Sequence, residues 1–212
     1  MVWRKILFGG AALAVIAGAA APAAAHSLEE LQGTLKKREK YLQVLQEPAP
    51  DFMLQDARGR EVGLADFSGK VVVLSFIYTN CPDVCPLHSE RLAEIQEMID
   101  PTPMGDMVQF ITITTDPAND TPEVMKAYGP AHGLDPVNWL FLTSGQSQPA
   151  ATRETAGRYG LKFTRVEDDY FMHGLVTFLI DKSGNLRAKY HGLKFKSAIF
   201  VMHVKALTDD DH

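Results

Sequence analysis

Two continuous apolar runs stand out in the middle of the chain, at residues 71–78 and 108–115. Both runs are rich in β-branched and aromatic residues, and neither alternates with polar positions. Such runs are typical of strands that are buried on both faces of a sheet. Between them, an apolar stripe at helical spacing predicts a helix that ends at about residue 99, just before a proline. The stripe consists of Leu92, Ile95 and Ile99.

Shorter elements surround this central pair of strands. The segment 121–128 opens with Thr121-Pro122-Glu123, in which threonine is a good N-cap and proline fits the first helical position. Strands that alternate with helices around a central apolar pair predict an α/β fold, with a mixed sheet covered on both faces. The other predicted elements are hairpins over 52–64 and 175–190, a strand over 139–142, and helices over 152–159 and 195–207.

Residues 27–46 carry leucines at a heptad-like spacing that is broken by Arg38. The leucines are Leu28, Leu31, Leu35, Leu42 and Leu45. The pattern predicts one N-terminal helix that lays a stripe on the domain or acts as a spacer, and a short dimerising coil is the alternative. Pro48 and Pro50 end this segment and mark the start of the compact domain.

The first 25 residues have the layout of a secretory signal. Arg4 and Lys5 form a short positive region, residues 6–20 are mainly apolar, and small residues precede a predicted mature N-terminus at His26. An uncleaved membrane anchor is the alternative, although the apolar run is short for a span of ~20 residues. Both interpretations predict a domain outside the cytoplasm, which in a bacterial cell is the periplasm. Membrane association is expected only if the segment stays uncleaved.

The charge of the chain excludes one class of function. The 212 residues carry a formal net charge of −5, and removal of Arg4 and Lys5 would leave 19 basic and 26 acidic side chains. The sequence shows no basic stripe that would hold nucleic acid, so nucleic acid is not expected as a partner. The expected organisation is a signal peptide over 1–25, a helix or spacer over 26–47, one domain over 48–207 and an acidic tail over 208–212.

Cys81 and Cys85 are the two cysteines of the chain, and they lie four positions apart. In an oxidising compartment such a pair is a structural bridge, a redox pair or part of a metal site. A bridge that closes so small a loop removes little entropy from the unfolded chain, which disfavours a purely structural role. Pro86 is best placed at the first helical position, which puts Cys85 near the N-cap. Both thiols are then expected at a helix N-terminus, with pKa values below the free value of about 8.5.

Residues 70–86, KVVVLSFIYTNCPDVCP, resemble the signature of the Sco/SenC family. These are thioredoxin-fold copper proteins that help to assemble the CuA centre of cytochrome c oxidase. Residues 116–122, DPANDTP, are similar to a second family segment, and the stretch from Asp169-Tyr170 through His173 to Asp181 is similar to a third. The resemblance covers about residues 50–207 and implies a thioredoxin-like fold. Together with the elements above, the expected architecture is a central mixed sheet flanked by helices, with an N-terminal β-hairpin and an extra N-terminal helix.

The resemblance implies a copper site with two cysteine ligands and one histidine ligand, which correspond to Cys81, Cys85 and His173. Thiolates are soft ligands that suit Cu(I), and an imidazole lets the same site hold Cu(II). Three ligands leave one position open, which transfer of the ion to a partner requires. Structural zinc sites, by contrast, are closed by four ligands.

Other residues could assist copper or shape the site. His88 lies three residues after Cys85 and could complete a local site, although a solvated first-turn histidine is the commoner case. Met172 and the N-terminal His26 of a cleaved chain are further candidate ligands. Asp116 and Asp120 are expected to be turn and capping residues in a loop that borders the site.

Three functions fit these features. A metallochaperone would bind copper through the implied ligands, receive it from another copper carrier and pass it to an oxidase subunit or another acceptor. A thiol–disulfide oxidoreductase would use Cys81 and Cys85 as a redox pair to reduce the cysteines of an acceptor, although dedicated redox proteins of this kind use C-x-x-C. A thiol peroxidase also uses a cysteine at a helix N-terminus, but that role leaves His173 without a purpose. The first function is preferred, and the protein is then not an enzyme.

Overall fold

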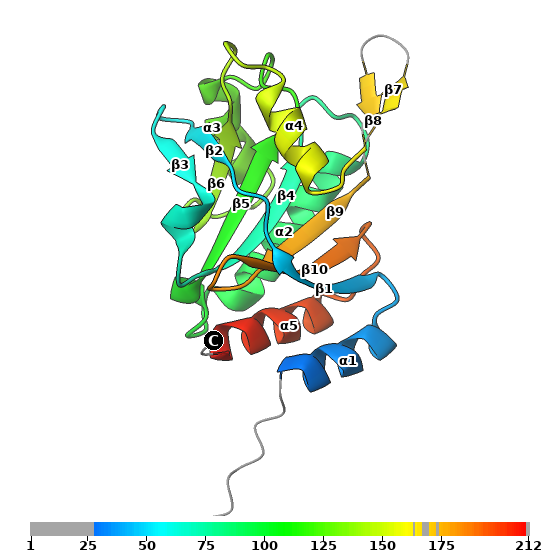
Figure 1. Ribbon diagram of the computed structural model, residues 1–212. Helices are drawn as coiled ribbons and strands as arrows, with labels where there is room; N and C mark the ends of the chain where they lie inside the picture. Colours follow the sequence, from blue (N-terminus) through cyan, green and yellow to red (C-terminus); the bar gives the residue numbers. More distant parts are fainter. Residues whose placement is uncertain (1–27, 163, 167–169, 173, 211–212) are drawn as a thin grey trace, which may run out of the picture.

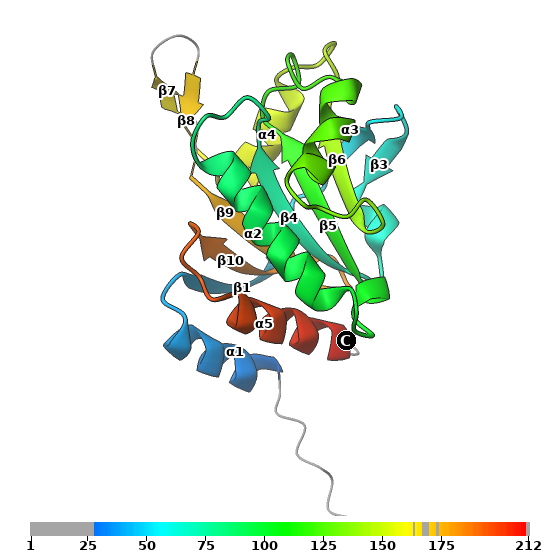
Figure 2. The same ribbon diagram turned by 180° about the vertical axis from the view of Figure 1, so that it is seen from behind.

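A computed structural model describes residues 28–162, 164–166, 170–172 and 174–210 of the chain. An eight-stranded mixed sheet runs through the described part, in the order β1-β10-β9-β4-β5-β6-β2-β3, and a separate two-stranded ribbon is formed by β7 and β8. Figures 1 and 2 show the sheet from its two sides, with helices on both.

The elements follow one another along the chain with these bounds. The strands are β1 (Leu42–Pro48), β2 (Met53–Asp56), β3 (Glu61–Gly63), β4 (Val71–Ile77), β5 (Val108–Thr114), β6 (Trp139–Thr143), β7 (Thr164–Val166), β8 (Tyr170–Met172), β9 (Val176–Ile180) and β10 (Asn185–His191). The helices are α1 (Leu28–Arg38), α2 (Val84–Ile99), α3 (Pro122–Ala131), α4 (Ala151–Arg158) and α5 (Ser197–Asp209), with short 3₁₀ turns at Leu64–Phe67 and Gly105–Met107.

Strand β4 is the centre of the sheet, and all seven of its residues are buried. It pairs in parallel with β5, from Val71↔Val108 to Ile77↔Thr114, and antiparallel with β9. Strand β6 pairs in parallel with β5, so the carboxyl ends of three strands meet at one edge of the sheet. The predicted α/β class, the mixed sheet and the buried central pair are confirmed.

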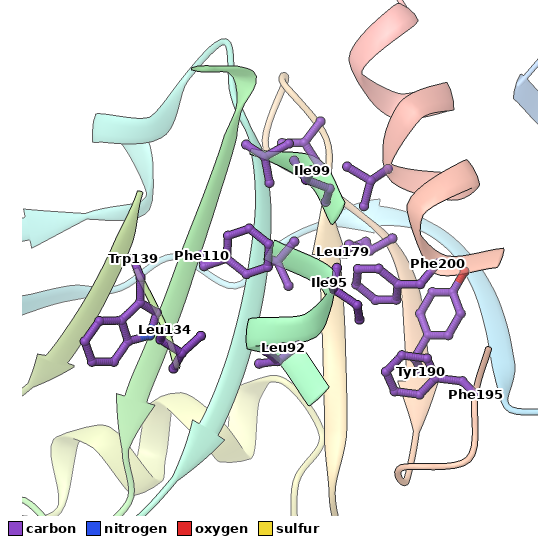
Figure 3. Close-up of a cluster of buried hydrophobic side chains, with 14 of the residues drawn as sticks. Leu92, Ile95, Ile99, Phe110, Leu134, Trp139, Leu179, Tyr190, Phe195 and Phe200 are labelled. Carbon is purple, nitrogen blue, oxygen red and sulfur yellow. The ribbon is translucent and has the colours of Figure 1, made fainter. Parts of the chain in front are cut away.

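Two hydrophobic clusters, one on each face, hold the helices to the sheet. On one face α2 buries the predicted stripe of Leu92, Ile95 and Ile99, which lies between Phe110 of β5 and Phe200 of α5 (Figure 3). The other cluster joins the opposite face of β4 and β5 to Tyr159, at the end of α4. Both faces of the sheet are therefore covered, as the pattern predicts.

The N-terminal segment differs from its prediction. The helix ends at Arg38, and residues 42–48 form strand β1, which pairs antiparallel with β10 from Leu42↔Tyr190 onward. The prediction of a single helix over 27–46 is therefore wrong. The second half of the leucine pattern pairs instead with β10, which lies almost 150 residues further along the chain. The helical half does lay a stripe on the domain, with Leu35 fully buried.

Polar side chains fix α1 against α5 beneath this edge. The ring of His203 is fully buried, its Nε2 lies 3.0 Å from Gln32 Nε2, and its Nδ1 lies 3.0 Å from the hydroxyl of Tyr190. Burial, with a smaller contribution from nearby Arg187, lowers the pKa of His203 to about 4. A neutral histidine of α5 therefore links α1 to β10 near the sheet edge. None of the helices that the structure describes is long and apolar enough to span a bilayer.

The stability of the fold should depend on pH through His203. The unfolded chain takes up a proton at this histidine below pH 6.5, whereas the folded chain resists it until about pH 4. Its contribution is complete above pH 6.5 and falls by about 3 kcal/mol as the pH drops towards 4. We expect His203→Gln to flatten the wild-type pH dependence over this window, measured as the free energy of unfolding in urea. His132→Gln is the control, and an equal pH dependence in the His203 variant would contradict the assignment.

Helix α3 approaches β6 closely enough to require glycine at one position. A Cβ at Gly129 would lie 2.1 Å from the indole ring of Trp139, whereas a Cβ at Gly157 in α4 would meet no heavy atom within 4 Å. Gly129→Ala should therefore lower the free energy of unfolding by about 1–3 kcal/mol. Gly157→Ala should leave it unchanged or raise it by up to about 1 kcal/mol. Urea denaturation of the two variants checks this. Equal free energies of unfolding would show that α3 can move away from Trp139 without loss of stability.

Candidate metal and thiol site

The two cysteines lie where the central strand passes into helix α2. Strand β4 ends at Ile77, and the amide of Cys81 donates to the carbonyl oxygen of Tyr78 at 3.3 Å, which turns the chain back towards the helix. The helix begins at Val84 after Asp83, so Cys85 is its second residue and Pro86 its third. The expected placement of Pro86 at the first position is off by two residues. Proline is still tolerated there, because the amides of the first turn have no partner within the helix.

Both cysteines are free thiols, and both are buried, with 8% of Cys81 and 2% of Cys85 exposed. Burial opposes ionisation of Cys81, but hydrogen bonds outweigh it and hold the pKa of Cys81 below its ordinary value. The Cys85 thiol is the strongest of these partners, followed by the backbone amides of Asp83 and Cys85 and by the Tyr78 side chain.

Cys85 has the opposite tendency, so the expectation of two acidic thiols is correct only for Cys81. Burial raises the pKa of Cys85 well above its ordinary value, and its hydrogen bond to Cys81 raises it further. The negative charge of Asp120 adds to this, although the Tyr78 backbone acts against it. The helix N-terminus alone does not decide the ionisation of a side chain that is so deeply buried. Cys81 therefore ionises more readily than a free thiol, whereas Cys85 stays protonated at neutral pH.

A buried carboxylate holds the strand-end of the cysteine loop in place. Asp120, on the loop between β5 and α3, accepts a hydrogen bond from the backbone amide of Thr79 at 3.2 Å. The hydroxyls of Thr79 and Thr114 donate to the same carboxylate. Burial raises the pKa of Asp120 despite these donors. The residue is thus a tether between the ends of two parallel strands, a role beyond the turn or capping residue expected from the sequence.

The neighbouring Asp116 does behave as a turn residue. Its carbonyl oxygen accepts the amides of Asn119 and Asp120 at 3.1 and 3.0 Å, and its carboxylate accepts the side-chain amide of Asn119 at 2.8 Å. The helix that follows begins as predicted, with Thr121 as N-cap accepting the amide of Val124. A signal for the Asp120 tether is present in the sequence, since Thr79 and Thr114 sit at the ends of the two apolar runs.

His88 is not the solvated first-turn histidine that the sequence suggests. Its ring is fully buried between α2 and β9, and its Nε2 lies 2.7 Å from the hydroxyl of Thr177. This position on the inner face of α2 follows from the helical spacing with Leu92 and Ile95, which are buried on the same helix. His88 therefore connects the cysteine helix to the strand beside β4.

Three of the candidate ligands cannot be located in the described structure. His26 and His173 lie outside the described residues, and of Met172 only the backbone, in strand β8, is described. Within the described residues, no three His, Cys, Asp or Glu side chains gather as a metal site. Ser75 of β4 pairs with Thr177 of antiparallel β9, so the end of β4 and the start of β9 lie at the same edge of the sheet.

Comparison with known proteins gives this arrangement a family. The family model described as SCO1/SenC matches residues 42–209, which include the whole sheet and the cysteine loop. The chain belongs to the SCO1/SenC family. The thioredoxin-like fold implied by the cysteine motif is therefore confirmed, as is the resemblance itself.

Relatives of this Sco-family chain come from distant organisms. The human mitochondrial protein SCO2 homolog is 34% identical over 144 residues, which are 67% of this chain and 53% of the human protein. The chain thus spans about half the length of that relative. The solved structure of BsSco, named as a member of the Sco family of cytochrome c oxidase assembly proteins with a disulfide switch, is 25% identical. It has a TM-score of 0.67 and covers 79% of this chain and 96% of its own.

Several solved structures among the neighbours have copper bound. ScoI of Bradyrhizobium japonicum with copper bound is 27% identical, with a TM-score of 0.62, over 76% of this chain and 99% of its own. Copper binding and cytochrome c oxidase assembly are therefore properties that occur among the proteins this chain is similar to.

The two thiols should differ in reactivity. At pH 7 iodoacetamide should alkylate Cys81 faster than Cys85 by about tenfold or more, because only thiolates attack it and only the pKa of Cys81 is lowered. Cys81→Ser and Cys85→Ser report each thiol alone, and the serine hydroxyl in the second variant can still donate to Cys81. Mass spectrometry follows the rates, and equal rates in the two variants would contradict the asymmetry.

Proposed function

We propose that this chain is an exported copper-binding metallochaperone, which delivers copper to the CuA site of a respiratory oxidase or to a similar acceptor. The observation that carries the proposal is the pair of free, hydrogen-bonded thiols that β4 and α2 hold at one edge of the sheet. Membership of the SCO1/SenC family and the copper-bound relative support the same metal. Another copper carrier would supply the ion.

The ligands of the proposed site are Cys81, Cys85 and His173. Two thiolates favour Cu(I), and the imidazole makes Cu(II) acceptable at the same site. The choice of His173 is supported by Leu175, two positions further along the chain, whose carbonyl oxygen accepts the amide of Gly192 at 2.8 Å just before β9 begins beside β4. An open coordination position would let an acceptor ligand attach before the chaperone ligands leave.

Export is part of the proposal. We expect residues 1–25 to act as a signal that is cleaved before His26, which places the domain in the periplasm. Free thiols persist in such an oxidising compartment only if they are kept reduced or are covered by a metal ion. A copper ion held by Cys81 and Cys85 would provide that cover.

A thiol–disulfide oxidoreductase that reduces the cysteines of a metal acceptor is the second candidate. The observation that favours it is the lowered pKa of Cys81 next to a protonated neighbour, which is the arrangement of an attacking thiol and a resolving thiol. The spacer of three residues between the cysteines acts against it, since dedicated redox proteins of this fold use C-x-x-C.

Copper titration of the reduced protein separates the two functions. We expect wild-type protein to bind one copper ion and His173→Ala to lose Cu(II) affinity by about 100-fold or more, because Cu(II) depends on the imidazole more than Cu(I) does. His132→Ala, a histidine at the end of α3, is the matched control and should bind as wild type. Competition with a chelator of known affinity gives the constants.

The opposite result would favour the second candidate. Suppose that His173→Ala binds Cu(I) and Cu(II) as tightly as wild type does, and that the reduced protein exchanges rapidly with a model disulfide. The chaperone assignment then fails, and the redox role replaces it. The exchange assay is therefore run on the same preparations, with Cys81→Ser as its negative control.

A further inference from the structure

A dense group of positive side chains lies at the end of the molecule that carries α1. Two segments far apart in the sequence form it, the last turn of α1 with the turn that follows and the loop between β10 and α5. We call this group the basic surface. It surrounds a shallow hollow of about 460 Å³, and all of its members are exposed. They are Lys36, Lys37, Arg38, Lys40, Lys194 and Lys196.

Glu39 explains why these charges stand together without being neutralised. Among the described residues that line the hollow it is the one acid, and it is buried. Its carboxylate accepts the backbone amides of Tyr41 at 3.1 Å and of Lys196 at 2.9 Å. The carboxylate is thereby committed to joining the two segments, and it faces away from solvent. Four of the six charges come from residues 36–40 and two from the loop after β10, so no single stretch of sequence shows the whole basic surface.

We propose that the basic surface docks the protein onto a membrane of anionic phospholipids, with the lysines against the headgroup phosphates. Protein interfaces centre on apolar or aromatic anchors. None of the large exposed apolar side chains of the described residues lines this hollow, and its one aromatic lining residue, Tyr41, is half-buried with the Lys40 ammonium 4.9 Å from its ring centre. Five of its six cations are lysines, which act as point charges rather than as bidentate forks. Clustered lysines without an exposed apolar centre fit a layer of headgroups.

The topology places part of the basic surface at the sheet edge that carries the cysteine loop. Strand β10 runs antiparallel to β9, and β9 runs antiparallel to β4, so the loop after β10, with Lys194 and Lys196, leaves the sheet at the edge where β4 ends. The body of α1 lies at the end of the molecule away from the loop that joins β4 to α2 (Figures 1 and 2). A membrane against the basic surface would therefore lie beside the strand ends that carry the thiols.

The N-terminal sequence supports docking of the basic surface onto a membrane. The apolar run of residues 6–20 ends eight residues before Leu28, and eight residues span at most about 29 Å. While that run is in a membrane, the basic surface is within reach of the same membrane, and the two attachments act together. After cleavage the basic surface remains. Membrane association thus need not depend on an uncleaved anchor, and it goes beyond the copper function proposed above.

Vesicle binding tests the proposal. The chain from His26 onward contains the whole described fold, and we expect it to bind vesicles of phosphatidylcholine mixed with phosphatidylglycerol at about 0.1 M salt, but not pure phosphatidylcholine. Neutralising Lys36, Lys37 and Lys194 to glutamine should weaken binding about 100-fold, roughly fivefold per charge. The control removes three exposed charges elsewhere and should bind as wild type. Its substitutions are Arg58→Gln, Lys126→Gln and Lys162→Gln.

The outcomes separate this surface from the copper site. Binding that falls with added salt and is lost only in the variant of the basic surface supports the proposal. Equal loss in both variants indicates nonspecific charge, and absence of binding to anionic vesicles leaves an acidic protein as the occupant; either result overturns it. Thermal melting confirms that each variant is folded. Copper titration should be unchanged in both variants, so a failure here does not reflect on the metal site.

Discussion

The burial of strand β4 on both faces is the constraint from which the rest of the structure follows. Its seven buried residues cannot face water, so helices must cover both sides of the sheet. Parallel pairing with β5 brings two strand ends to one edge, and the chain must leave that edge directly into α2. The cysteine loop is thus placed by the most buried strand of the fold, at the edge where ligands of α/β sheets usually bind.

Asp120 fixes the conformation at the start of the cysteine loop. A carboxylate with two percent exposure is costly unless its oxygens are occupied, and here the Thr79 amide and two threonine hydroxyls occupy them. The same charge lies close enough to disfavour ionisation of Cys85. One side chain therefore fixes the start of the loop and contributes to the difference between its two thiols, while His88 ties the helix that follows to β9.

Patterns that depend on neighbouring residues were predictable, and those that depend on distant ones were not. The buried strands, the stripe of α2 and the cap at Thr121 come from local sequence, and all three are confirmed. The N-terminal helix is wrong beyond Arg38 because β10 supplies the competing pairing. The raised pKa of Cys85 arises from burial, which no local motif encodes. The family motif located the thiols correctly, whereas the role of His173 stays a prediction, since it lies outside the described residues.

The unequal thiols have a consequence for ligand exchange, if copper is the cargo. A metal ion that binds both sulfurs must displace the proton of Cys85, and each unit by which that pKa is raised subtracts about 1.4 kcal/mol from the binding free energy at a pH below it. Release is helped by the same amount, because Cys85 regains its proton as soon as the ion leaves. Cys81, whose pKa is lowered, gives up its proton at a smaller cost than Cys85 does, so it is the thiol suited to hold the ion last. The order of transfer would then be set by burial: Cys85 yields first, and Cys81 completes the exchange with the acceptor.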